Sequence, residues 1–257
     1  VHNFFKDSKT KFLIKILGKF RSVKKIVFVS DTVRKHLPSL KYKSDVVSNG
    51  IDMSKFEFSH NGKSQIRKEF GIPNDTKIIS TIGWMMPSKR QDILLKAIPS
   101  ILNFKKNIHF LIIGGSRNGY EYYSEKLLYL VKELKIQHYV TFTGHRTDIP
   151  NFLKEVYINV ITSEEAFPFT LLEGWAAGVP AIGPNFGSIP ELIEDGVTGL
   201  IFDHNRPEDL SEKILTLLKD REKHQKIVED SLKKSTEFDI HTFNKKIHAL
   251  VDEVLQT

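Results

Sequence analysis

The chain has 257 residues, 40% of them hydrophobic, with 38 Lys and Arg against 31 Asp and Glu and no cysteine. This length allows one large domain or one and a half ordinary ones, and the lack of cysteine excludes disulfides, zinc thiolate sites and thiol nucleophiles. No apolar run approaches the roughly 18 residues of a membrane span, and no secretory leader is visible, so we expect a globular protein located in the cytoplasm.

The amino-terminal segment holds the excess positive charge. Residues 1–45 contain 12 Lys and Arg and 3 Asp, whereas the rest of the chain has a net charge of −2. The run KTKFLIKILGKF, residues 9–20, places Lys11, Lys15 and Lys19 on one stripe of an amphipathic helix. Such a helix either packs on a core with its lysines solvated or lies on an anionic membrane. No nucleic-acid-binding motif accompanies the charge, so we expect no nucleic acid partner.

Strand and helix patterns alternate along the chain. This alternation predicts an α/β protein with a parallel sheet covered by helices on both faces. The polar, glycine-bearing stretch 46–63 is typical of a linker between two units. Strands are predicted at residues 25–29, 77–82, 108–113, 140–143, 158–161, 180–183 and 199–202, and helices at 31–40, 63–70, 91–102, 122–134, 148–155, 170–177, 207–218 and 239–255.

A first group of polar residues follows the strand 77–82. Gly83 ends this strand, and Ser88, Lys89 and Arg90 stand at the start of the next helix. A lysine in this place can approach a diphosphate beside the positive end of the helix dipole and stabilise a departing nucleoside diphosphate. The alternative is a lysine near a helix start that makes no specific contact. His145 and Arg146, after the strand 140–143, either border a nucleobase or lie on the surface.

Two carboxylates surround the start of the helix 170–177. Glu165 falls in the loop after the strand 158–161, and Glu173 lies about one turn inside the helix. Ligands of open parallel sheets gather beyond the carboxyl ends of the strands, where a helix amino terminus offers N–H groups to an anion. The two acids therefore flank the expected place of a diphosphate, and Thr170 can cap the helix. Their spacing alone fits two solvated surface acids equally well.

The segment 162–200 resembles the retaining glycosyltransferases of family 4, also called glycosyl transferases group 1. The signature of that family is two glutamates separated by seven residues, a small-residue run, Gly-x-Pro, and a downstream Gly-x-x-x-Glu-x-x-x-x-Gly-x-x-Gly. The matching residues here are Glu165, Glu173, Ala176, Ala177, Gly178, Pro180, Gly187, Glu191, Gly196 and Gly199.

The resemblance implies the GT-B fold, in which two Rossmann-like domains face each other across a cleft. Residues 47–52 look like the interdomain segment of the family. By this comparison residues 1–45 are the last part of the amino-terminal, acceptor-side domain, and residues 46–235 form a complete carboxyl-terminal domain that binds the nucleotide-sugar donor. Residues 236–257 carry a helix that crosses back to the amino-terminal domain. Roughly the first hundred residues of a family enzyme would precede this chain.

The resemblance also implies an activity, the transfer of a hexose from a UDP or GDP sugar to an acceptor hydroxyl with retained configuration. In that comparison Glu165 acts as a catalytic residue that positions the donor sugar, Glu173 holds the ribose, and Lys89 binds the phosphates. His2 matches a second catalytic residue at the cleft. The further donor-binding residues are Gly83, Arg90, Phe167, Pro168, Phe169 and Thr170.

Three positions depart from the family pattern. Trp84 stands in place of an arginine that binds phosphate, and Arg90 stands in place of a glycine. Without the arginine's bidentate fork, phosphate binding relies on Arg90 from another direction or is weaker. Pro168 replaces a common glycine and removes one N–H donor from the loop, which indicates a variation in the donor sugar.

The expected partners are a nucleotide-sugar donor, a sugar or lipid-linked acceptor and, through the basic helix, an anionic membrane surface at the cytoplasmic side. This set is typical of cell-surface polysaccharide or glycolipid biosynthesis. The sequence has no Asp-x-Asp motif, so we expect neither a metal site nor a cofactor. Two alternatives are a nucleotide-sugar-binding remnant without catalysis and a related two-domain enzyme, either an epimerase of nucleotide sugars or a phosphorylase.

Overall fold

The computed structural model describes residues 8–56 and 65–256. Its main feature is a six-stranded, fully parallel sheet with the strand order β5-β4-β3-β6-β7-β8. Strands β4 and β5 lie on one side of β3, and strands β6 to β8 lie on the other. The boundary between β3 and β6 is therefore a switch point of the kind at which open α/β sheets bind ligands. The strands are β3 (Lys77–Ile82), β4 (Ile108–Ile113), β5 (Val140–Phe142), β6 (Val156–Val160), β7 (Ala181–Pro184) and β8 (Leu200–Phe202).

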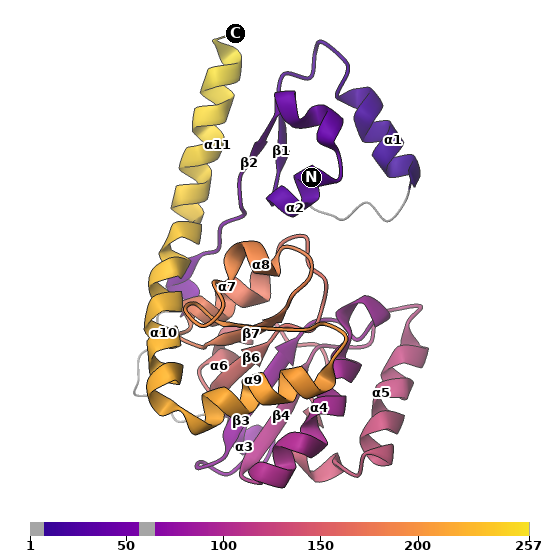
Figure 1. Ribbon diagram of the computed structural model, residues 1–257, viewed down its shortest axis with the longest axis vertical. Coiled ribbons are helices and arrows are strands. Elements are labelled where there is room, and N and C mark those ends of the chain that lie inside the picture. Colours follow the sequence, from indigo (N-terminus) through magenta and orange to yellow (C-terminus); the bar gives the residue numbers. More distant parts are fainter. Residues whose placement is uncertain (1–7, 57–64, 257) are drawn as a thin grey trace.

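Helices cover both faces of this sheet, as the alternation predicts (Figure 1). Successive strand residues point to opposite faces, so Ile79 and Phe110 join the core on one side, whereas Ile78 and Leu111 join the core on the other. The first side is covered by α4 (Gln91–Phe104), α5 (Glu121–Glu133) and α9 (Pro207–Lys219). The second carries α3 (Gln65–Glu69), α6 (Ile149–Leu153), α7 (Phe169–Ala176) and α8 (Ile189–Leu192).

A smaller amino-terminal unit lies above α7 and α8 in Figure 1. Its two strands pair in parallel, and Phe28 and Val33 pack in the same hydrophobic cluster as Trp175 of α7 and Ile189 of α8. The unit therefore shares buried surface with the main domain. Its elements are α1 (Ser8–Leu17), β1 (Ile26–Phe28), α2 (Asp31–Lys35), a 3-10 helix (Pro38–Lys43) and β2 (Ser44–Val46).

The prediction of one helix over residues 31–40 is wrong. The α-helix α2 ends at Lys35, and a 3-10 helix begins at Pro38. Pro38 disfavours the helical conformation at the residue before it. Leu37 accordingly has φ −131° and ψ 60°, outside the helical region. This break shortens α2 to five residues.

The carboxyl-terminal helices return to the amino-terminal unit. Helix α10 (Arg221–Ser235) leads into α11 (Ile240–Leu255), which runs upward beside β2 (Figure 1). Lys25 Nζ lies 3.1 Å from Glu253 Oε1 of α11 and 2.7 Å from Asp45 Oδ2 of β2. Helix α11 thus contacts the amino-terminal unit, and the division of the chain into domains at residues 45 and 235 stays a prediction.

Helix α1 carries large apolar side chains at the surface of the described structure. The large apolar side chains Phe12, Leu13 and Leu17 are exposed, with Phe12 at 66%. Among the side chains of this helix that the structure describes, Ile14 packs partly against the core. Within residues 8–56 and 65–256, no helix is both long enough and apolar enough to cross a bilayer.

Candidate functional site

Glycine backbones join the loops that follow β3, β4 and β5. Gly83 N–H donates to the Ile113 carbonyl at 2.8 Å, and Gly114 N–H donates to the Gly144 carbonyl at 3.1 Å. Gly114 has φ +149°, and a Cβ atom there would lie 2.0 Å from Gly83 O. Only glycine permits this approach. The strand ends are thus fixed, and Gly83 lies against the side chain of Lys89.

Lys89 and Glu165 meet at the carboxyl edge of the sheet. Lys89 Nζ lies 2.5 Å from Glu165 Oε1, and Ser163 Oγ donates to the same oxygen at 2.5 Å. Thr162 Oγ1 donates to the Lys89 carbonyl at 2.5 Å, which ties the loop after β6 to the start of α4. The side chains of Lys89 and Glu165 are 27% and 20% exposed, so both remain open to a ligand.

Helix α7 is positioned by a buried asparagine that the sequence analysis missed. Asn159 of β6 is 1% exposed; its Nδ2 donates to the Thr170 carbonyl at 2.9 Å, and its Oδ1 accepts from Ser80 Oγ at 3.1 Å. Gly174 lets α7 lie close to Asn159, because a Cβ atom at Gly174 would be 3.2 Å from Asn159 Nδ2. The asparagine thereby fixes the first turn of α7 relative to the sheet.

The expected cap of α7 by Thr170 is wrong. The helix begins at Phe169, its N-cap is Pro168, and no side chain caps it. Thr170 is already the second helical residue, because the chain enters the helix directly from the proline. The amides of the first turn therefore lack a side-chain cap.

Glu173 lies on α7, and burial raises the pKa of its carboxyl group above the usual range. Burial is the sole cause of this shift; hydrogen bonds and charges of the described residues do not contribute. A carboxylate in such a place is costly to keep ionised unless it accepts a hydrogen bond.

The three residues before and at the start of α7 differ in exposure. Phe167 and Pro168 are buried, and the Phe167 ring packs edge to face on Phe169 at 5.5 Å and tilted against Phe238 at 6.4 Å. Phe169 is 46% exposed. Of the three predicted lining residues, Phe169 is thus the one open to a ligand.

A cavity of about 450 Å³ lies beside the Lys89–Glu165 pair and includes Arg90. Arg90 adopts the left-handed conformation with φ 50° between the 3-10 helix Pro87–Lys89 and α4. Phe186 and His204, which follow β7 and β8, stack in this cavity at 4.9 Å. Sequence reasoning missed both, although each follows the carboxyl end of a predicted strand. The lining residues are Met86, Pro87, Ser88, Arg90, Tyr120, Thr162, Glu164, Pro184, Phe186 and His204.

Trp84 stacks on His145, with ring centroids 4.9 Å apart and planes at 9°. Gln91 Nε2 donates to the Trp84 carbonyl at 3.0 Å and holds the loop. Arg146 turns away to Glu69 and Asp148, whose hydrogen bonds raise the pKa of its guanidinium. His145 rather than Arg146 is therefore placed beside the loop after β3.

The predicted catalytic His2 and the question of a metal site complete the comparison with the sequence. His2 lies outside the described residues. Within the described part of the chain, no group of three or more histidine and carboxylate side chains is arranged to hold a metal ion.

The Rossmann-like sheet, with part of a second parallel sheet facing its carboxyl edge, is the architecture of GT-B proteins. Residues 62–234 match the family model "Glycosyl transferases group 1", and the chain belongs to this family. The resemblance seen in the motif is thereby confirmed, as is the predicted fold class.

Curated relatives share the family and are longer. The chain is 27% identical over 201 residues to D-inositol 3-phosphate glycosyltransferase of Corynebacterium glutamicum, covering 75% of this chain and 47% of the relative. It is 32% identical over 167 residues to N-acetyl-alpha-D-glucosaminyl L-malate synthase of Bacillus anthracis, covering 65% of this chain and 42% of that enzyme. The chain thus spans about half the length of the curated relatives it matches.

Solved structures agree on the fold. Anabaena HepE, solved with UDP and glucose, superposes with a TM-score of 0.88 at 21% identity over 96% of this chain and 68% of HepE. The carboxyl-terminal domain of a group 1 glycosyl transferase from Francisella tularensis superposes with a TM-score of 0.67 at 22% identity and is covered completely by 74% of this chain. The additional residues of this chain form part of a second domain.

Proposed function

We propose that the full-length protein containing this chain transfers a sugar from a nucleoside diphosphate donor to an acceptor hydroxyl, with retained anomeric configuration. The observation that carries the proposal is the convergence of Lys89 and Glu165 at the switch point of the sheet, next to the uncapped start of α7. A cation, an acid and a helix amino terminus in one place suit a diphosphate linked to a sugar.

Each residue has a proposed role. Lys89 and the first amides of α7 take up the charge of the departing diphosphate, and Glu165 orients the donor sugar. Lys89 has three N–H donors, so it can keep Glu165 and also donate to a phosphate oxygen. Glu173 accepts hydrogen bonds from the ribose hydroxyls, which would compensate the burial of its carboxylate.

The proposed reaction exchanges one bond for another. The acceptor oxygen forms a bond to the anomeric carbon while the bond from that carbon to the diphosphate oxygen breaks. The departing diphosphate takes the electron pair and accepts the proton of the acceptor hydroxyl. Gly83, Arg90, Phe169 and Thr170 complete the proposed donor site, and Phe167 and Pro168, whose side chains are buried, support it from behind Phe169.

Named relatives support this class of chemistry. Two curated relatives are named as a glycosyltransferase and a glucosaminyl malate synthase, and HepE has been solved with UDP-glucose. We propose UDP or GDP as the nucleotide and a hexose as the sugar. The exposed apolar side chains of α1, among its lysines, support a peripheral contact with an anionic membrane and hence a lipid-linked acceptor.

The test is donor binding and transfer by the full-length protein, measured with a panel of UDP and GDP sugars. Glu165→Ala should lower the transfer rate at least roughly 100-fold, the scale of a lost interaction with the reacting centre. Full activity of Glu165→Ala would contradict the assignment. Binding of the nucleotide sugar without transfer, by a protein with its whole amino-terminal domain, would favour the non-catalytic alternative.

A further inference from the structure

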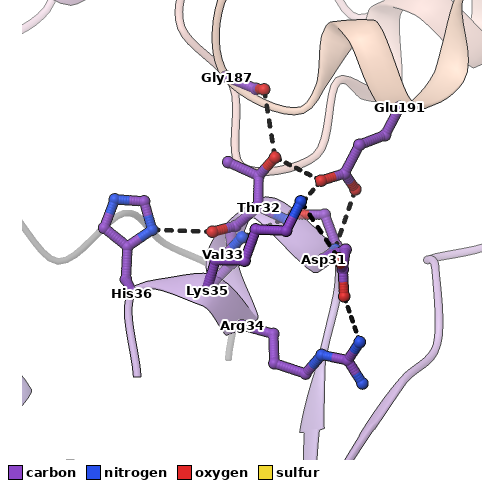
Figure 2. Close-up of polar contacts among 9 residues, drawn as sticks. Asp31, Thr32, Val33, Arg34, Lys35, His36, Gly187 and Glu191 are labelled. Atoms are coloured by element: carbon purple, nitrogen blue, oxygen red, sulfur yellow. Dashed lines mark hydrogen bonds and ion pairs between the residues drawn. The ribbon is translucent and has the colours of Figure 1, made fainter. Parts of the chain in front are cut away.

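A glutamate of the main domain binds the amino terminus of a helix in the amino-terminal unit. Glu191 of α8 points toward α2 in Figure 2. Asp31 N–H donates to Glu191 Oε2 at 2.9 Å, and both the amide and the hydroxyl of Thr32 donate to Glu191 Oε1. We call this set of contacts, Glu191 with Asp31 and Thr32, the Glu191 latch.

The Glu191 latch provides hydrogen-bond acceptors for the first two amides of α2. Ser30, the N-cap residue, accepts a hydrogen bond from Val33 N–H at 3.3 Å, which leaves the amides of Asp31 and Thr32 without a local acceptor. The carboxylate of Glu191 satisfies both from about 160 residues away in the chain. Hydrogen bonds to a carboxylate are stronger than neutral ones, and three of them link the two units here.

The segment before Glu191 leads directly to Glu165. Ser188 donates to the Glu165 carbonyl twice, from its amide at 3.0 Å and from its hydroxyl at 2.8 Å. Gly187 has φ +68°, and a Cβ there would lie 2.9 Å from Glu165 O and 3.1 Å from Glu165 N. The Gly187 carbonyl is also 3.4 Å from Thr32 Oγ1. One short, tightly packed segment thus contacts both α2 and the backbone of Glu165.

We propose that Glu191 is a positioning residue: the latch it forms with Asp31 and Thr32 couples closure of the amino-terminal unit to the placement of Glu165. The catalytic consequence rests on the proposed function, whereas the latch rests on the contacts alone. Binding linkage is reciprocal, so a donor held by Glu165 strengthens the latch and the latch raises donor affinity by the same factor. A coupling of roughly tenfold falls in the usual range for two linked sites.

The matched variants are Glu191→Gln and Glu194→Gln in the full-length protein. Glutamine at 191 keeps one acceptor oxygen but places an N–H₂ group against a backbone N–H. Glu194 is exposed, lies two residues after the end of α8, and belongs to neither the latch nor the proposed donor site. The two changes remove the same charge three residues apart.

The first measurement is amide hydrogen exchange without any donor. Glu191→Gln should speed exchange at Asp31 and Thr32 at least several-fold, and also at residues 164–167 and 187–188, while Glu194→Gln should match the wild type. Unchanged exchange at Asp31 and Thr32 would overturn the latch. Faster exchange there, with residues 164–167 unaffected, would reduce Glu191 to a helix cap and overturn the coupling.

The second measurement is affinity for UDP-glucose and GDP-mannose, together with the rate of transfer. Glu191→Gln should weaken binding of the accepted donor roughly tenfold, and Thr32→Val, which replaces the hydroxyl with a methyl group, should act in the same direction with a smaller effect. Equal donor affinity in wild type and Glu191→Gln would contradict the coupling. If the wild type binds no nucleotide sugar, the proposed function fails, and the exchange data still decide whether the latch positions Glu165.

Discussion

Lys89 Nζ lies 2.5 Å from Glu165 Oε1, joining the loop after β3 to the loop after β6 across 76 residues of sequence. The two strands are neighbours at the switch point of the sheet. The pair therefore stands where open α/β sheets collect their ligands.

Replacing Lys89 should affect binding more than stability. Because the Lys89–Glu165 pair is partly exposed, we expect Lys89→Ala to change the free energy of unfolding by about 1 kcal/mol or less. Affinity for a nucleoside diphosphate should fall at least roughly tenfold, since a charged hydrogen bond to phosphate contributes about 1.5–3 kcal/mol. Calorimetric titration with UDP and GDP and a thermal melt measure the two quantities. Lys96→Ala removes an exposed lysine from α4 and is the control; equal losses in both variants would contradict the assignment.

Replacing Glu173 should raise stability and lower donor affinity. Burial raises the pKa of Glu173, so the folded chain binds a proton there more tightly than the unfolded chain. The ionised group then opposes folding above its raised pKa, and this cost decreases as the pH falls through that pKa and is lost below the pKa of the unfolded chain. We expect Glu173→Gln to melt roughly 2 °C higher than the wild type at pH 7, with a smaller gap in acid. Donor affinity should fall roughly tenfold. A lower melting temperature at pH 7 would contradict the account.

Trp84 stands where the family pattern has a phosphate-binding arginine, and its ring stacks on His145. Trp84→Arg exchanges this stack for a guanidinium with a bidentate fork. We expect tighter binding of UDP by several-fold and no gain for uridine, which has no phosphate. Titrations with both compounds test this, and an equal gain for uridine would show that the arginine does not contact phosphate.

Gly187 and Gly196 form a matched pair for testing the segment behind Glu165. Both have positive φ, +68° and +83°, but an added Cβ meets the Glu165 backbone only at Gly187 and open space at Gly196. We expect each alanine variant to lose about 1–3 kcal/mol of stability from backbone strain. Only Gly187→Ala should also lower the transfer rate, measured at a temperature where both variants are folded. Equal rates would mean that the position of Glu165 does not depend on this contact.

Much of the sheet was predictable, because its strands are apolar and β-branched. The predicted bounds 77–82 and 108–113 coincide with β3 and β4. Strand β2 has only three residues, SDV, and shows no alternation that sequence reasoning could detect. Helix α10 was missed because Ile227, Val228 and Leu232 are almost its only apolar residues.

The site was predictable only where a motif places its residues. Lys89 and Glu165 were chosen from the motif, and the structure brings them together. Asn159 was invisible, because its role depends on a close approach between β6 and α7. The partner of Glu191 was equally hidden, since Thr32 lies about 160 residues away and nothing in either segment indicates the other.

The central claim is that a nucleoside diphosphate sugar binds between Lys89, Glu165 and the start of α7. The most direct measurement is a titration of the isotope-labelled protein with UDP-glucose and GDP-mannose, followed through its backbone amide resonances. The account predicts saturable shifts for one donor that cluster at Gly83, Lys89, Glu165 and Thr170 and that need at least roughly tenfold more donor in Lys89→Ala. Saturable shifts that gather elsewhere, with these four amides unmoved, would contradict it.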